Sequence, residues 1–191
     1  MKPLTMDSLD FIGMAYLSDT SICDQLIKYH NDSLEKKEGL IGSGVNKDIK
    51  DSTDVSIHPE QFILDPIIKE YLIQLQEVCE KYIEKYAYCN SGQAWTIKDS
   101  FNIQHYAPKQ GYFSYHAEKT GGNCDRHLTF MTYLNDIFDG GETEFYYQGI
   151  KIQPRKGLTL IWPVQWTHTH RGIISSTQDK YIATGWYEYV I

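Results

Sequence analysis

The 191-residue sequence has no excess of positive charge, no long apolar run and no motif of closely paired cysteines. Its formal net charge is −7, and its 18 Lys and Arg residues are scattered, which argues against a basic face for duplex nucleic acid. No stretch approaches the roughly 20 apolar residues that span a bilayer. Residues 1–17 are interrupted by Asp7, Asp10 and Gly13, unlike a signal peptide. We therefore expect no nucleic-acid partner and no membrane anchor.

The cysteine content is low for a disulfide-stabilised protein. The four cysteines are Cys23, Cys79, Cys89 and Cys124, and none forms a C-x-x-C pair. A chain of this length can bury a sizeable core without disulfides, so reduced thiols and a cytoplasmic location are the simple expectation. Hydrophobic residues make up 41% and charged residues 23% of the sequence, as in ordinary globular proteins. We expect a single domain over residues 1–191.

Helical signals lie in residues 1–90. The polar run 18–21 offers an N-cap before apolar residues at helical spacing, which predicts a helix ending near Asn31. Asp65-Pro66 combines a cap with a proline at the first helical position, and the apolar stripe that follows predicts a helix to about Tyr86. Residues 39–59 are rich in Gly, Ser, Asp and Lys, which indicates a long irregular connection, with a lid or an edge hairpin both open.

Strand signals dominate residues 91–191. Short runs rich in Tyr, Phe, Thr, Trp and Ile are separated by glycines and prolines, and seven or eight strands fit there. Many short strands of this kind indicate a sandwich or barrel, of which the double-sheet jelly roll is one. The predicted fold class is therefore α+β, with a double-stranded β-helix (jelly-roll) core at 91–191 and supporting N-terminal helices on its outer face.

Three side chains suggest a metal centre. His116 and Glu118 are two positions apart in a strand-like stretch, so both side chains project from one face. His170 follows the apolar run 158–163 and can supply a second imidazole from a neighbouring strand. Two histidines and one carboxylate leave three open positions on an octahedral ion, as in non-haem iron(II) oxygenases. An H-x-E pair alone is common, however, and a surface hydrogen-bonded pair is the alternative.

Several further motifs occur in a fixed order around these residues. Lys180 lies ten positions after His170, and Tyr106 lies ten positions before His116. The run Arg126-x-x-Thr129-x-x-x-Tyr133 precedes a Gly140-Gly141 turn, and residues 180–186 form a last apolar strand. Together, over roughly residues 101–189, these features resemble the 2-oxoglutarate and iron(II)-dependent oxygenases, and within them the prolyl 4-hydroxylase-like group.

The resemblance implies a role for each motif. Iron(II) would be held by His116, Glu118 and His170, and the far carboxylate of 2-oxoglutarate by Lys180. The hydroxyls of Tyr106, Thr129 and Tyr133 would complete the 2-oxoglutarate site, because a lysine is a point charge and gives little direction by itself. Arg126 and Trp186 would border the substrate pocket. The implied activity is a dioxygenase that uses molecular oxygen, with ascorbate as a further candidate cofactor. A peptidyl proline is the leading substrate, and another amino acid or a small molecule stays open.

Two features leave alternatives open. Glu118 replaces the usual Asp and is longer by roughly one bond of 1.5 Å, and Asp125 is the nearest substitute. His168 shares a strand face with His170 and could bind metal, donate to a ligand or line the entrance. The rival function is a cupin-like metal or carbohydrate-binding jelly roll without oxygenase activity, although residues 171–176 lack the Glu expected for it.

The remaining histidines and one tryptophan are predicted to lie outside the site. His105 and His127 point away from it by strand parity, which suggests structural or exposed positions. His30 and His58 are expected to be solvent groups, and Trp162 is expected in the core.

Overall fold

The computed structural model describes residues 5–190, and its centre is a nine-stranded sheet. Every pairing between its strands is antiparallel. Along the sheet the strands are β1 (Asp7–Leu9), β2 (Ile12–Tyr16), β14 (Leu158–Pro163), β11 (Arg126–Tyr133), β16 (Lys180–Tyr189), β9 (Phe101–Tyr106), β7 (Thr53–Ile57) and β3 (Lys37–Glu38), while β8 (Trp95–Thr96) pairs with β16.

A smaller sheet faces the large one. Its strands are β13 (Ile150–Ile152), β12 (Thr143–Phe145) and β15 (His170–Gly172). Two short ladders accompany it, β4 (Leu40–Ile41) with β5 (Gly44–Val45), and β6 (Lys50–Asp51) with β10 (Gly111–Tyr112). Buried Phe145 and Ile152 of the small sheet pack with Met131, Leu160 and Trp162 of the large one. This two-sheet sandwich confirms the predicted jelly roll.

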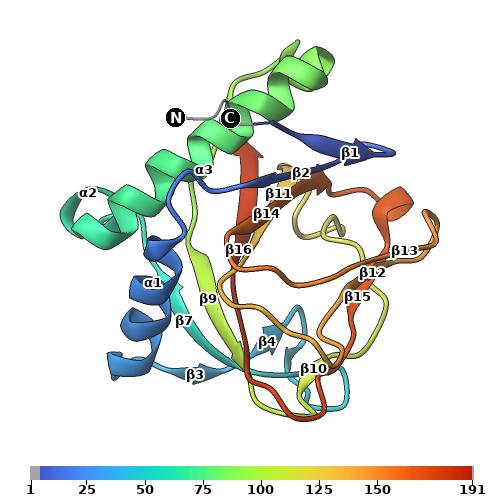
Figure 1. Ribbon diagram of the computed structural model, residues 1–191. Coiled ribbons are helices and arrows are strands. Elements are labelled where there is room, and N and C mark those ends of the chain that lie inside the picture. The colour runs from blue at the N-terminus through green and yellow to red at the C-terminus, as the bar shows by residue number, and fades with distance from the viewer. Residues whose placement is uncertain (1–4, 191) are drawn as a thin grey trace.

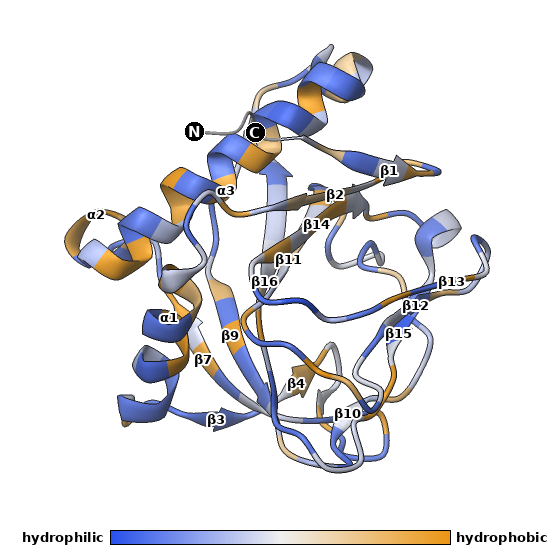
Figure 2. Ribbon diagram, in the orientation of Figure 1, coloured by the Kyte–Doolittle hydropathy of each residue, from blue (hydrophilic) through white to orange (hydrophobic). Residues whose placement is uncertain are grey.

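The helices lie together on the opposite side of the large sheet (Figure 1). They are α1 (Ser21–Asp32), α2 (Gln61–Leu64) and α3 (Pro66–Lys85), with the short 3-10 turns η1 (Ala87–Asn90) and η2 (Trp166–His168) elsewhere. The start of α3 is fixed as predicted, because Asp65 Oδ1 accepts from the amides of Ile67 (2.9 Å) and Ile68 (3.2 Å). Hydrophobic and hydrophilic residues alternate along α3 (Figure 2). Its apolar stripe packs on the sheet to form the larger core.

The N-terminal part of the chain contains more strands than the sequence predicted. Residues 7–16 form the hairpin β1–β2, and residues 37–57 form five strands, of which β7 is hydrogen-bonded into the large sheet. The β1–β2 turn carries no glycine signal, because Asp10 (φ 46°) and Phe11 (φ 67°) adopt the left-handed conformation there. The prediction that residues 39–59 form an irregular connection was therefore wrong where β7 lies. The alternative of an edge hairpin is confirmed by the pairing of β4 with β5. After residue 91 there are nine strands, including the two-residue β8 and β10.

All four cysteines are free. Within residues 5–190, no helix combines the length and apolarity needed to cross a bilayer. The predicted cytoplasmic location stays a prediction.

Candidate active site

The backbone brings the two candidate histidine ligands together. His116 and His170 form an isolated antiparallel bridge, in which each amide donates to the other carbonyl at 2.9 Å. His116 lies just beyond β10 rather than within a strand, and His170 begins β15. Glu118 Oε1 then lies 3.7 Å from His116 Nε2 and 3.3 Å from His170 Nε2. The three residues that the sequence assigned to the metal therefore meet at one point.

Second hydrogen bonds orient both imidazoles. The Nδ1–H of His116 donates to the Ser114 carbonyl (3.1 Å), and the Nδ1–H of His170 donates to the His168 carbonyl (2.9 Å). The Nε2 atoms consequently turn their lone pairs toward Glu118. Burial, followed by the proximity of His170, lowers the pKa of His116 to about 4, so this imidazole is neutral at pH 7.

The converging atoms fit a divalent cation. Two lone pairs and a carboxylate oxygen repel one another unless a proton or a metal ion lies between them. Burial opposes ionisation of Glu118, but the contact with the His170 ring, followed by the neighbouring His116 and Arg126, outweighs it and lowers the Glu118 pKa to about 2. Donors of one ion with bonds of about 2.1 Å are separated by about 3.0 Å in adjacent octahedral positions and about 3.4 Å in a tetrahedron. The observed 3.3 and 3.7 Å are close to both. In residues 5–190 no other group of three such side chains converges this closely.

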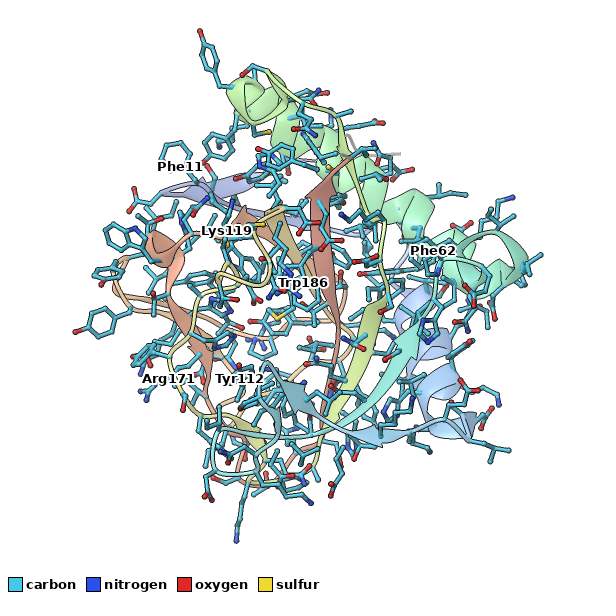
Figure 3. The ribbon with its side chains drawn as sticks, turned by 180° about the vertical axis from the view of Figure 1, so that it is seen from behind. Phe11, Phe62, Tyr112, Lys119, Arg171 and Trp186 are labelled. Carbon is cyan, nitrogen blue, oxygen red and sulfur yellow. The ribbon has the colours of Figure 1, made fainter. Side chains whose placement is uncertain are left out.

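The second oxygen of Glu118 has its own partners. The Trp186 indole N–H donates to Oε2 at 3.0 Å. The Arg126 guanidinium stacks on that indole at 3.3 Å and donates to the Glu118 carbonyl at 3.0 Å. Figure 3 shows Trp186 on β16, with Tyr112 and Arg171 on the other side of the opening. Arg126 and Trp186, expected to border the substrate pocket, line the cavity and also contact Glu118, one of the candidate metal ligands.

Lys180 occupies a buried position at the start of β16. Its Nζ donates to the Gly141 carbonyl at 2.7 Å and lies over the rings of Tyr106 (5.7 Å) and Tyr133 (5.5 Å). Gly140 (φ 120°) and Gly141 (φ 76°) make the turn that brings this carbonyl inward, in a conformation that favours glycine. Burial lowers the pKa of Lys180 to about 8.

The three hydroxyl groups predicted to bind 2-oxoglutarate differ in their hydrogen-bond partners. Thr129 Oγ1 is buried and has no hydrogen-bond partner among the described residues. The Tyr106 hydroxyl donates to Gln104 Oε1 at 2.7 Å, and the Tyr133 hydroxyl lies 2.6 Å from Thr143 Oγ1. Thr143 lines the cavity, and sequence reasoning missed it. Its only signal is its place two residues after Gly141, at the start of β12.

One cavity of about 520 Å³ lies beside these groups, although Thr129 and Tyr133 do not line it. Lys180, Tyr106, Thr143 and Met131 lie on its walls together with the three candidate ligands. The lining also includes a buried ion pair that the sequence did not reveal. Lys50 Nζ lies 2.6 Å from Asp54 Oδ2, and the Ser52 hydroxyl donates to Asp54 Oδ1 at 2.8 Å. Residues 40–42 of the β4–β5 hairpin complete the lining.

The alternative ligands lie outside the cluster. The Nε2–H of His168 donates to the Asp10 carbonyl at 2.9 Å, and only the His168 backbone takes part in the site, by orienting His170. Asp125 pairs with Lys98. Glu118 is therefore better placed to bind a metal than Asp125, and His170 is better placed than His168.

The other histidines lie outside the cluster as well. His105 pairs with Asp179 and His127 donates to the Cys89 carbonyl. His58 is exposed, whereas the solvent role expected for His30 was wrong. His30 is only 1% exposed because its Nε2 is bonded to the Thr53 carbonyl of β7. Trp162 is buried in the core as predicted.

The matched region coincides with this site. Residues 101–188 match the family model described as the 2OG-Fe(II) oxygenase superfamily, and they contain all three candidate ligands and Lys180. The matched region therefore contains a group of side chains that fits iron(II) and a buried lysine that fits 2-oxoglutarate, the metal and co-substrate for which this superfamily is named.

Proteins similar to this chain include prolyl hydroxylases. A probable prolyl 4-hydroxylase of Arabidopsis thaliana is 28% identical, over 46% of this chain and 40% of its own length, so the chain matches less than half of that relative. The 2-oxoglutarate complex of a viral collagen prolyl hydroxylase from Paramecium Bursaria Chlorella virus-1 has a TM-score of 0.70 at 19% identity, covering 95% of this chain and 97% of the other.

A third relative is the prolyl hydroxylase of Trichoplax adhaerens bound to a hypoxia inducible factor peptide fragment. It has a TM-score of 0.74 at 18% identity, covering 94% of this chain and 84% of the other. At these identities the two solved structures establish the shared fold, in agreement with the two-sheet sandwich described above.

Proposed function

We propose that the protein is an iron(II)- and 2-oxoglutarate-dependent dioxygenase that hydroxylates a peptidyl proline. The observation that carries this proposal is the pairing of two features in one cavity. His116, Glu118 and His170 converge with their ligand atoms facing one another, and Lys180 is buried in the same cavity as a cation. A metal ion would bind the three converging ligand atoms. A dicarboxylate could bind that ion at one end and the Lys180 ammonium at the other.

Lys180 needs an anion that the protein does not supply. No Asp or Glu within residues 5–190 lies at ion-pair distance from its ammonium, and its one hydrogen bond in that range goes to a neutral carbonyl. A buried, unpaired charge is unfavourable. The far carboxylate of 2-oxoglutarate would neutralise it, with the hydroxyl of Thr143, which lines the same cavity, as a further polar group.

The residues fit the requirements of the superfamily's reaction. When bound, iron(II) and 2-oxoglutarate supply the oxidation: one oxygen atom of O₂ enters succinate as carbon dioxide leaves, and the other enters the substrate as a hydroxyl. The protein provides three ligands and leaves the remaining positions of a six-coordinate ion open. Tyr112 stacks on the His116 ring at 3.7 Å and shields it on one face.

The substrate class rests on the relatives. The Arabidopsis relative is named a probable prolyl 4-hydroxylase, and the Trichoplax prolyl hydroxylase was solved with a peptide fragment. Among the residues that line the cavity, Leu40 of the β4–β5 hairpin is 60% exposed, so we propose that a peptide enters there. A peptide containing proline is therefore the substrate class that we propose.

The test is a turnover assay with matched peptides. The purified protein is incubated with iron(II), 2-oxoglutarate, ascorbate and oxygen, together with a proline-rich peptide or the same peptide with each proline replaced by alanine. We expect succinate and a gain of one oxygen atom with the proline peptide alone. Oxidation of the alanine peptide to the same extent would contradict proline as the target. Absence of succinate under every condition would favour a jelly roll that binds ligands without oxidising them.

A further inference from the structure

We propose that Trp186 and Arg126 confine Glu118 to binding the metal through one oxygen, and that this keeps a position open for 2-oxoglutarate. The inference rests on the proposed iron site but not on the substrate. It gives two residues that were expected to contact substrate a positioning role toward a metal ligand. Its basis is the division of the carboxylate between two environments.

The two carboxylate oxygens of Glu118 face different partners. Oε1 faces the imidazoles, 3.3 Å from His170 Nε2 and 3.7 Å from His116 Nε2. Oε2 accepts the Trp186 indole N–H at 3.0 Å and lies 3.8 Å from an Arg126 nitrogen. The side chain is only 13% exposed, so water cannot readily replace either partner. Oε1 is therefore the metal-facing atom and Oε2 is held away from the metal.

The number of open positions makes this division important. A carboxylate can bind a metal through one oxygen or through both. With two histidines and one carboxylate oxygen, three positions of an octahedral ion stay open. The keto acid end of 2-oxoglutarate takes two of them and oxygen needs the third. If Glu118 bound through both oxygens, it would compete directly with 2-oxoglutarate.

A glutamate needs this restraint more than an aspartate does. Its extra methylene adds a rotatable bond, so the carboxylate can turn its second oxygen toward the ion. The structure restrains it at both ends, because Arg126 donates to the Glu118 carbonyl and Trp186 donates to Oε2. The departure from the usual Asp is thus accompanied by a hydrogen bond that fixes the longer side chain.

Arg126 in turn fixes the indole. Its guanidinium lies 3.3 Å from the centre of the Trp186 ring, and a second nitrogen lies 3.9 Å from Glu188. The backbones of β11 and β16 place these residues, since Thr129 is directly opposite Trp186 and Arg126 is opposite Glu188. The stacked pair leaves the indole N–H one direction, toward Glu118.

The test separates metal binding from 2-oxoglutarate binding. Trp186→Phe keeps a smaller aromatic ring for the stack and removes the N–H donor. Without oxygen, Mn(II) is titrated first by electron paramagnetic resonance, and 2-oxoglutarate is then titrated into the Mn(II)-loaded protein by calorimetry. We expect Mn(II) affinity that is unchanged or higher, with 2-oxoglutarate affinity lower by about tenfold, the size of one hydrogen bond to a charged group. Co(II) absorption should show a changed ligand field before 2-oxoglutarate is added.

Control variants keep the result interpretable. Trp95→Phe removes an indole N–H that has no partner among residues 5–190, on β8 next to the same strand, and should leave both affinities unchanged. Arg126→Met removes the guanidinium above the ring and should shift 2-oxoglutarate affinity in the same direction, and it decides the question if Trp186→Phe does not fold. Equal loss of both affinities, or no change in either, would overturn the proposal. Failure of the unchanged protein to bind Mn(II) would instead overturn the proposed function.

Discussion

Replacing Lys180 by methionine should stabilise the ligand-free protein and at the same time weaken its binding of 2-oxoglutarate. Lys180 is charged at pH 7 although burial lowers its pKa from 10.5 to about 8. At 1.36 kcal/mol per pKa unit, this burial costs the folded state about 3 kcal/mol. Methionine fills a similar volume without the charge.

The net gain is smaller than that cost. The substitution also removes the bond from Nζ to the Gly141 carbonyl, and a buried carbonyl without a donor costs about 1–2 kcal/mol. We therefore expect unfolding in urea to require about 1–2 kcal/mol more free energy, and the melting temperature to rise by a few degrees. Binding should change in the opposite direction, because a hydrogen bond between charged groups contributes about 1.5–3 kcal/mol, equivalent to about 10- to 100-fold in affinity.

Two measurements on one variant test this reasoning. Urea denaturation of the metal-free protein gives the stability, and calorimetric titration of the Mn(II)-loaded protein gives the 2-oxoglutarate affinity. Lys28→Met is the matched control, because Lys28 is 75% exposed and pairs with Asp32 on the surface, where such a pair contributes at most about 1 kcal/mol. A Lys180→Met protein that is less stable, or that binds 2-oxoglutarate as tightly as the unchanged protein, would refute the assignment of Lys180 as a buried, unsatisfied cation.

Further predictions concern the same cavity and its support. Raising the pH through about 8 deprotonates Lys180, so the affinity for 2-oxoglutarate should fall above that pH, which titration at several pH values checks. Between about pH 8 and 10.5 the unfolded state binds more protons than the folded state, so the stability of the ligand-free protein should rise there, which denaturation at the same pH values checks. His170→Ala should abolish Mn(II) binding, whereas His168→Ala should retain it and lower only the melting temperature, because the His168 ring bonds to a distant carbonyl. Asp65→Ala should cost about 1 kcal/mol in urea denaturation without changing turnover, because it removes the cap of α3. Gly185→Ala should destabilise the protein and weaken Mn(II) binding, because a Cβ there would lie 2.6 Å from one buried phenylalanine and 2.7 Å from another and would displace the adjacent Trp186.

The parts of the structure that could be predicted have short-range causes. Helix α3 follows from a cap, a proline and an apolar stripe that are contiguous in sequence, and the structure reproduces its bounds within one residue. Such signals need no knowledge of the rest of the chain.

The missed strands have no such local signal. The β1–β2 turn uses Asp10 and Phe11 in conformations that glycine or asparagine usually adopts. Strand β7 is recognisable only through its neighbour β9, because five residues of mixed polarity do not specify a sheet on their own. Lys50 and Asp54 even have the spacing of a helical ion pair, yet they come from two different strands.

The sequence predicted which residues form the candidate site, but not the contacts between them. Spacing along the chain pointed to His116, Glu118, His170 and Lys180, since ligands two apart share a face and the resemblance fixed the rest. Spacing could not show that the Tyr133 hydroxyl is bonded to Thr143. Hydrogen bonds between side chains far apart in sequence depend on register and rotamer, neither of which a single sequence specifies.

Strand β16 carries both Lys180 and Trp186 and holds them in a fixed arrangement. Lys180 and Trp186 lie six residues apart on it, an even interval that turns both side chains to the cavity face. The strand is hydrogen-bonded to β11 on one side and β9 on the other, so neither residue can shift without disturbing the centre of the sheet. The anchor for the organic acid and the restraint on the metal-binding carboxylate are therefore held at a fixed separation. An oxidation in which a bidentate acid, a metal and oxygen must fit together needs that kind of fixed geometry, because small displacements of reacting groups are costly.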